Sequence, residues 1–233
     1  MTKRMNINQL TGKSATRYSH APVRSVIYFL IVSEGEKTEP NYFGTFVGRR
    51  GSKIVSVKCK GGRKNTTQLI VEAKKIQNQD RKQGKEYDSI WVVFDKDQFP
   101  DKDFEDAITK APRDGINVAW SNPSFELWYL LHLCDTTKEL TPAQCIREIE
   151  KIVNKSRVQK PIRLFKYDKA SKDFSWLERG VNQRAAIARA EKLQKSQIGV
   201  NYAQQNPCTT VYQLVRQLIG EDDEFNEKIL KRL

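Results

Sequence analysis

The chain has 233 residues, of which 38% are hydrophobic, and its formal net charge is +13 at pH 7. This length suits one large domain or a domain with an appended subdomain. No apolar run approaches the ~18 residues of a membrane-spanning helix, and the N-terminus has no signal-peptide core, so we expect a cytoplasmic protein with no membrane partner. The 4 cysteines form no C-x-x-C pair and there are only 2 histidines, which argues against a disulfide framework and against zinc sites.

The first part of the chain is expected to alternate strands and helices. Residues 1–21 are polar, basic and aperiodic, which predicts a flexible basic arm. Hydrophobic periodicity then predicts strands at 25–33, 53–59, 90–94 and 116–120, and helices at 38–47, 66–79, 101–110 and 123–133. In the last helix, Asn122 would be the N-cap and Pro123 the first helical residue. This alternation predicts an α/β fold with an open, mainly parallel sheet flanked by helices, whose core spans 22–135.

The remaining residues, 136–233, predict a mostly helical C-terminal region packed on that core. Thr141 and Gln144 have the spacing of a capping box, which would open a helix to about Asn154. Two more helices are expected at 182–196 and 207–219, whereas the charged stretch 156–180 has no clear assignment. His132 lies in an apolar helical stretch, which favours a partly buried residue over a catalytic one.

Carboxylates follow two of the expected strands. Glu34 comes directly after the first strand, and Asp95 and Asp97 follow the apolar strand 90–94. Because parallel strands deliver side chains to one crevice at their carboxyl ends, these acids would repel one another unless they bind protons or a cation. A divalent hard cation prefers such oxygen ligands. The alternative for Glu34 is a surface turn whose acids stabilise the next helix through its dipole. The alternative for Asp95 and Asp97 is an ordinary polar turn.

A further acid, Glu126, interrupts the apolar first turn of the helix expected at 123–133. A helix-dipole role is the alternative to a site role here. Apolar residues cover much of the circumference of this helix, which makes an exposed acid at this position less expected.

Basic residues gather in three blocks, at 1–24, 40–71 and 151–195, and the first two contain no acid. Such blocks attract the phosphates of a nucleic acid, although solvated surface is the alternative. The residues that we single out for nucleic-acid binding are Arg49, Arg50, Arg63, Lys64 and Lys166.

Three motifs resemble those of a known family. They are V-S-E-G-E-K-T-E-P-N-Y-F at 32–43, V-F-D-K-D at 93–97 and S-N-P-S-F-E-L-W-Y-L-L-H at 121–132. Together they resemble the RloB-like family, which is related to the AbiL-type abortive-infection proteins. The E-G followed by D-x-D also resembles the Toprim catalytic domain of topoisomerases, primases and nucleases. The resemblance implies a Toprim-like fold, a Mg²⁺ or Mn²⁺ site, and a role in antiphage defence, often beside an ATPase partner.

The resemblance also implies roles for the acids. Glu34 would be a metal ligand or general base, Asp95 and Asp97 would be metal ligands, and Glu126 a further catalytic acid or ligand. A second acid follows the E-G in related nucleases. Glu36 and Glu39 both qualify, and Glu39 is preferred because it could face back from the start of a helix.

Residues 166–169 resemble the C-terminal basic motif of the family. Lys169 or Lys166 could stabilise charge on the transferring phosphate, and surface salt bridges are the alternative for both. The combined expectation is a metal-dependent nuclease that cleaves RNA, including transfer RNA, or DNA. A non-catalytic nucleic-acid-binding sensor and a regulatory subunit of an ATPase-containing complex are the other two hypotheses.

Overall fold

The computed structural model describes residues 25–50, 53–62, 66–97, 99–156 and 164–232. The expected basic arm at 1–21 lies outside them, as do Arg63 and Lys64. The described residues form a six-stranded sheet in the order β2-β3-β1-β4-β5-β6. The strands are β1 (Ser25–Ser33), β2 (Gly48–Arg50), β3 (Lys53–Gly61), β4 (Ser89–Asp95), β5 (Asn117–Asn122) and β6 (Cys208–Thr209). The four central strands are parallel, and the two edge strands, β2 and β6, are antiparallel to their neighbours.

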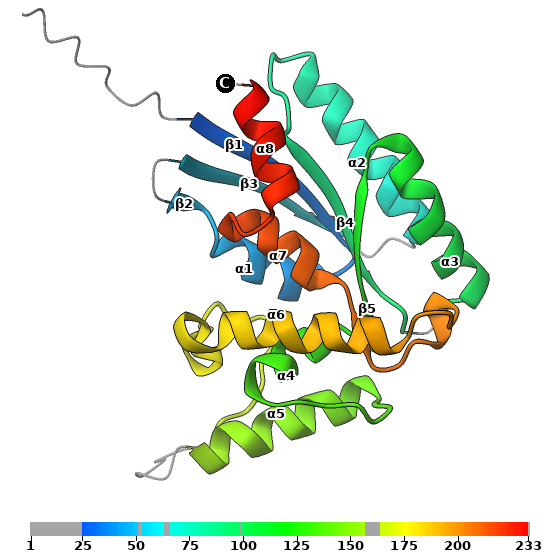
Figure 1. Ribbon diagram of the computed structural model, residues 1–233, viewed down its shortest axis with the longest axis vertical. Coiled ribbons are helices and arrows are strands. Elements are labelled where there is room, and N and C mark those ends of the chain that lie inside the picture. Colours follow the sequence, from blue (N-terminus) through cyan, green and yellow to red (C-terminus); the bar gives the residue numbers. More distant parts are fainter. Residues whose placement is uncertain (1–24, 51–52, 63–65, 98, 157–163, 233) are drawn as a thin grey trace, which may run out of the picture.

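Helices cover both faces of this sheet (Figure 1). On one face lie α2 and α3, and on the other lie α1, α7 and α8, while α4 lies between α5 and α6 beside the sheet. The helices are α1 (Thr38–Gly44), α2 (Thr66–Arg81), α3 (Asp101–Lys110), α4 (Glu126–Leu133), α5 (Pro142–Ser156), α6 (Arg179–Ser196), α7 (Val211–Ile219) and α8 (Asp223–Arg232). Short 3-10 turns occupy Ala111–Asp114, Ser175–Leu177 and Tyr202–Gln204. No helix in the described ranges is long and apolar enough to cross a bilayer.

The apolar strands are buried on both sides. Phe29 and Ile31 of β1 pack on the α1 side, whereas Leu30 and Val32 pack on the α2 side. In β4 every residue from Ser89 to Phe94 is buried. Continuous apolar runs are typical of central parallel strands with helices on both faces, so the expected α/β fold is confirmed.

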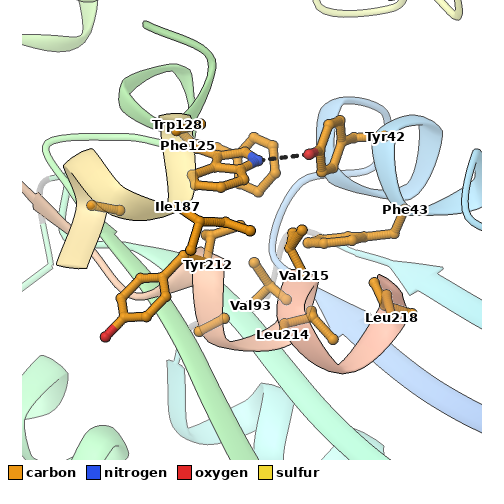
Figure 2. Packing of buried hydrophobic residues seen from close by; sticks show 14 of the residues in the cluster. Tyr42, Phe43, Val93, Phe125, Trp128, Ile187, Tyr212, Leu214, Val215 and Leu218 are labelled. Carbon is orange, nitrogen blue, oxygen red and sulfur yellow. Dashed lines mark hydrogen bonds between the residues drawn. The ribbon is translucent and has the colours of Figure 1, made fainter. Parts of the chain in front are cut away.

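Aromatic packing fixes α1 against the start of α4 (Figure 2). The indole Nε1 of Trp128 donates a hydrogen bond to the Tyr42 hydroxyl at 2.8 Å, and both side chains are buried. The rings of Tyr42 and Phe125 also meet edge to face, with 5.6 Å between their centroids. Buried indole and phenol groups need such partners, and this pair holds the first turns of two helices in one place. Each of these turns carries an acid, Glu39 in α1 and Glu126 in α4.

The expected start of the helix at 123–133 is wrong. Asn122 is not an N-cap but the last residue of β5, where it pairs with Cys208 of β6, and its side chain donates to the Ala203 carbonyl at 3.0 Å. The helix begins at Glu126, after a cis Asn122–Pro123 peptide. Pairing with β6 holds Asn122 extended, and this long-range contact overrides the local signal.

The C-terminal region departs from expectation in a similar way. The helix expected from 207 starts only at Val211, because Cys208 and Thr209 extend the sheet. β2 and α8 were not expected. The capping box of α5 is confirmed, since Thr141 and Gln144 exchange backbone-to-side-chain hydrogen bonds of 2.7 and 3.3 Å. His132 is fully buried rather than partly so, with Nδ1 2.9 Å from the Trp128 carbonyl oxygen.

Candidate metal centre

The carboxyl ends of β1 and β4 lie side by side and place two acids together. Glu34 directly follows β1, and its backbone N–H donates to the Val93 carbonyl at 2.9 Å. The Asp95 backbone N–H in turn donates to Oε2 of Glu34 at 3.3 Å. Burial raises the pKa of the Glu34 carboxyl, and the charge of Asp97 adds to this effect, although the Asp95 N–H partly opposes it. The sheet therefore brings the first-strand glutamate over the end of β4, as the sequence predicted.

Glu39 reaches back from the first turn of α1 and is buried, with only 4% of its surface exposed. Its Oε1 accepts a hydrogen bond from the Gly35 backbone N–H at 3.2 Å. A Cβ on Gly35 would collide with this carboxylate, so glycine at this position leaves the space that the Glu39 side chain occupies. Burial, followed by the negative charges of Glu126 and Glu34, raises the pKa of Glu39 to about 7.

A second glycine keeps this loop in place from the neighbouring strand. Gly61 ends β3, and a Cβ there would collide with the carbonyl oxygen of Gly35 and approach Cα of Glu36 to 2.6 Å. Of the two acids considered for the extra ligand, Glu36 is exposed and Glu39 is buried. The loop between β1 and α1 thus turns one carboxylate inward and leaves the other facing solvent.

The two aspartates of the D-x-D motif differ in their surroundings. Oδ1 of Asp95 is enclosed and has no hydrogen-bond partner. Burial raises the Asp95 pKa well above its usual range, and repulsion from Glu39, Glu126 and Glu34 raises it further. Asp97 is exposed, and its φ of 31° puts a non-glycine residue in the left-handed region. Such strained backbone is often found at functional sites, where the surrounding structure holds it.

Glu126 is buried in the first turn of α4, with 2% of its surface exposed. One carboxylate oxygen accepts a 2.7 Å hydrogen bond from the Ser124 hydroxyl, and the other accepts one of 3.1 Å from the Tyr167 hydroxyl. Lys169 Nζ lies 3.4 Å from that second oxygen, while the lysine side chain remains 64% exposed. A solvent-facing acid that merely stabilises the helix dipole would not be enclosed in this way.

These side chains line one open cleft of about 520 Å³, which we call the acidic cleft. Its lining includes Glu34, Gly35, Glu36, Glu39, Asp95, Asp97, Glu126 and Lys169. Within the described ranges, no three carboxylate, imidazole or thiol groups are placed closely enough to coordinate one ion as the side chains stand. The donor set nevertheless fits a hard cation, because all the acids offer oxygen and the enclosed oxygen of Asp95 lacks a partner.

Of the other basic residues singled out from the sequence, only Lys166 has a side chain that the structure describes, and it does not line the acidic cleft. Lys166 is exposed and pairs with Glu150, with 3.2 Å between Nζ and Oε2. The backbone of β2 includes Arg49 and Arg50, but their side chains lie outside what the structure describes.

Three residues of the site were not expected from the sequence. Ser124 and Tyr167 hold the Glu126 carboxylate, and Gly61 makes room for the loop after β1. The S-x-E spacing before α4 could have indicated Ser124. Tyr167 lies in the motif at 166–169, but nothing local indicated its contact with Glu126, because the two residues are 41 positions apart.

Comparisons with curated proteins and with solved structures gave no match. A family model described as RloB-like protein matches residues 29–218, a range that contains every acid of the acidic cleft. The match covers most of the chain and includes all three motifs identified in the sequence. The chain therefore belongs to the RloB-like protein family.

Proposed function

We propose that the protein is a Mg²⁺- or Mn²⁺-dependent nuclease with a Toprim-like catalytic domain. It would cleave phosphodiester bonds in RNA, including transfer RNA, or in DNA. The observation that supports this most is the gathering of four partly or fully buried carboxylates around one cleft beside a lysine. Ionised acids repel one another there, which favours a cation among them. The resemblance to the AbiL-type proteins supports an effector role in antiphage defence, with an ATPase as a candidate partner.

The residues that would hold the cation are Glu34, Asp95 and Asp97, with Glu39 as a further ligand. When bound, Mg²⁺ or Mn²⁺ would act as a Lewis acid and neutralise charge that develops on the phosphate. Asp95 supplies the enclosed oxygen that lacks a protein partner. Glu39 is held by the Gly35 N–H, so its carboxylate is oriented before any ligand arrives.

Two other side chains of the acidic cleft would act on the substrate directly or through their neighbours. Lys169 is exposed at the cleft and carries positive charge that a phosphate oxygen can approach. Glu126 pairs with Lys169, and the Ser124 and Tyr167 hydroxyls fix the orientation of the Glu126 carboxylate. For Glu34 the alternative to a ligand role is that of a general base, which its partial burial and raised pKa suit.

The test is cleavage of labelled single- and double-stranded RNA and DNA by purified protein, with Mg²⁺, Mn²⁺ or a chelator present. We expect products only with metal, and none from Asp95→Ala or Lys169→Ala. Lys151→Ala is the matched control, because Lys151 is similarly exposed and also pairs with a glutamate, Glu148, outside the cleft.

Each contrary outcome identifies another hypothesis. Metal-independent binding without cleavage would favour the nucleic-acid-binding sensor. Failure both to bind and to cleave, together with co-purification of an ATPase, would favour the regulatory subunit.

A further inference from the structure

A second cavity of about 300 Å³ lies beside the acidic cleft, and we call it the aromatic pocket. Its lining includes five aromatic side chains, Tyr129, Phe165, Tyr167, Phe174 and Trp176. Tyr129 is buried, whereas the other four rings are only half-buried. Its volume is at the lower end of the roughly 300–1,000 Å³ range of ligand pockets, which suits one small planar group rather than an extended ligand.

Two residues connect this pocket to the acidic cleft. Lys169 lines both cavities. Tyr167 lines the aromatic pocket with its ring, and its hydroxyl donates to Glu126 of the cleft at 3.1 Å. A ligand seated on the aromatic rings is therefore next to the groups that would act on a phosphate.

The aromatic rings of the pocket pack against one another. Trp176 lies 5.2 Å from Phe165 and 5.6 Å from Tyr129, measured between ring centroids, and its Nε1 donates to the Asp173 carbonyl at 3.0 Å. This packing fixes the indole plane in advance, so a ligand that stacks on it would not have to order it first.

We propose that the aromatic pocket holds one unstacked nucleobase of a single-stranded nucleic acid and thereby places the adjoining phosphodiester at the acidic cleft. This inference rests on the proposed nuclease function and specifies its substrate class. Aromatic rings beside cations are the chemistry that recognises single strands, because every base offers a π-face and every linkage a phosphate. A base inside a duplex is already stacked and cannot enter such a pocket unless it is extruded.

The charges around the pocket are mixed. Lys166 and Lys169 are exposed, with 76% and 64% of their side chains accessible, and can meet the backbone phosphates. Asp168 and Asp173 also line the pocket and oppose a phosphate placed near them. Carboxylates instead accept hydrogen bonds from the amino groups of a base, so these two acids suit the polar edge of the ligand.

Binding in the presence of a chelator separates this inference from the cleavage reaction. The probes are a labelled single-stranded RNA, the corresponding duplex, and a single strand with the same backbone but abasic positions. We expect the single strand to bind more tightly than both others, and the abasic strand to bind roughly 5- to 150-fold more weakly, the usual effect of losing one stacked base. This comparison needs no altered protein.

Two variants locate the effect. Trp176→Leu removes the indole and should reduce the preference for bases by the same factor. Leu164→Glu is the safer variant, because Leu164 lines the pocket yet is 63% exposed, so the change should not disturb folding. A charge about 4 Å from a phosphate should weaken binding about fivefold. Leu230→Glu is the matched control, since Leu230 is also 63% exposed but lies on α8, away from the pocket.

The outcomes distinguish the two proposals. A base-dependent preference that Trp176→Leu reduces, together with binding that Leu164→Glu weakens and no cleavage of any substrate, would support the pocket and refute the nuclease. Cleavage with equal binding and cutting of the base-containing and abasic strands would support the nuclease and overturn the pocket. Equal binding of single strand and duplex, or no binding of any probe, would also overturn the pocket.

Discussion

The buried carboxylate of Glu39 makes the stability of the metal-free protein depend on pH in a predictable direction. Its pKa is raised from 4.5 to about 7, first by burial and then by the charges of Glu126 and Glu34. The folded protein therefore binds more protons than the unfolded chain between these two values. The contribution of Glu39 to the free energy of unfolding therefore falls as the pH rises from about 4.5 to 7, and it is fully present below that window.

The magnitude follows from the same shift. One pH unit corresponds to about 1.4 kcal/mol, so ionised Glu39 costs the metal-free fold about 3 kcal/mol at neutral pH. Glu39 is only 4% exposed, so solvent screens this effect little. For a chain of this length, the melting temperature should change by roughly 6–12 °C across the window. The pKa of Asp95 is raised as well, which adds to the fall in the same direction.

The assay is thermal unfolding in a chelator and in Mg²⁺ or Mn²⁺, at a series of pH values from below 4.5 to above 7. A cation that replaces the protons should recover the lost stability, so the metal-induced rise in melting temperature should grow as the pH increases. Glu39→Gln removes one titrating group. The free energy of unfolding of this variant, relative to that of the unaltered protein, should therefore increase by about 3 kcal/mol from the lowest to the highest pH of the series.

Glu36→Gln is the matched control for this experiment. Glu36 lies on the same loop but is exposed, so its replacement removes an acid without removing a buried carboxylate. Two results would refute the reasoning. One is a Glu39→Gln protein that differs from the unaltered protein equally at every pH, and the other is a metal effect that does not depend on pH.

Two further predictions concern the groups that frame the acidic cleft. Glu126→Gln keeps a hydrogen-bonding amide but loses the charge next to the cleft, so we expect nuclease activity to be lost with little change in melting temperature; normal activity would remove Glu126 from the site. Glu148→Gln is its control, because the Glu148 side chain is 43% exposed and pairs with Lys151 outside the cleft. Gly61→Ala should destabilise the fold by about 1–3 kcal/mol through the collision with the loop after β1, and should impair metal binding. Gly62→Ala, with open space around its Cβ, should stay within about 0.5 kcal/mol, and an equal effect of both alanines would contradict the crowding argument.

The central part of the fold could be predicted because its signals are local. The interiors of β1 and β4 are continuous apolar runs, and α3 has the expected bounds, Asp101–Lys110. β6 could not be predicted in this way, since two residues from the C-terminal region become a strand only by pairing with Ser121 and Asn122. The same pairing explains the late start of α4. Local preferences therefore predicted the elements whose bounds do not depend on pairing with a strand far away in the sequence.

The residues of the site likewise include some that local sequence signals predicted and some that they did not. Glu34 and Asp95 could be placed together from sequence, because acids at the ends of neighbouring parallel strands share one edge of a sheet. Glu39 was preferred over Glu36 for a reason that agrees with its burial, namely its position at the start of a helix. Tyr167 was not singled out, because its contact with Glu126 depends on how the segment after α5 folds back over α4.

The acidic cleft is held together by packing rather than by the attraction of its own groups. Glu34, Glu39, Asp95 and Glu126 come from four different elements, and their ionised forms oppose one another. What fixes α1 against α4 is the buried aromatic contact centred on the Tyr42–Trp128 hydrogen bond. This packing holds several acids together with too little positive charge beside them, and their repulsion lowers the stability of the fold at neutral pH. Such a loss is expected at a functional site, where a ligand supplies the missing positive charge.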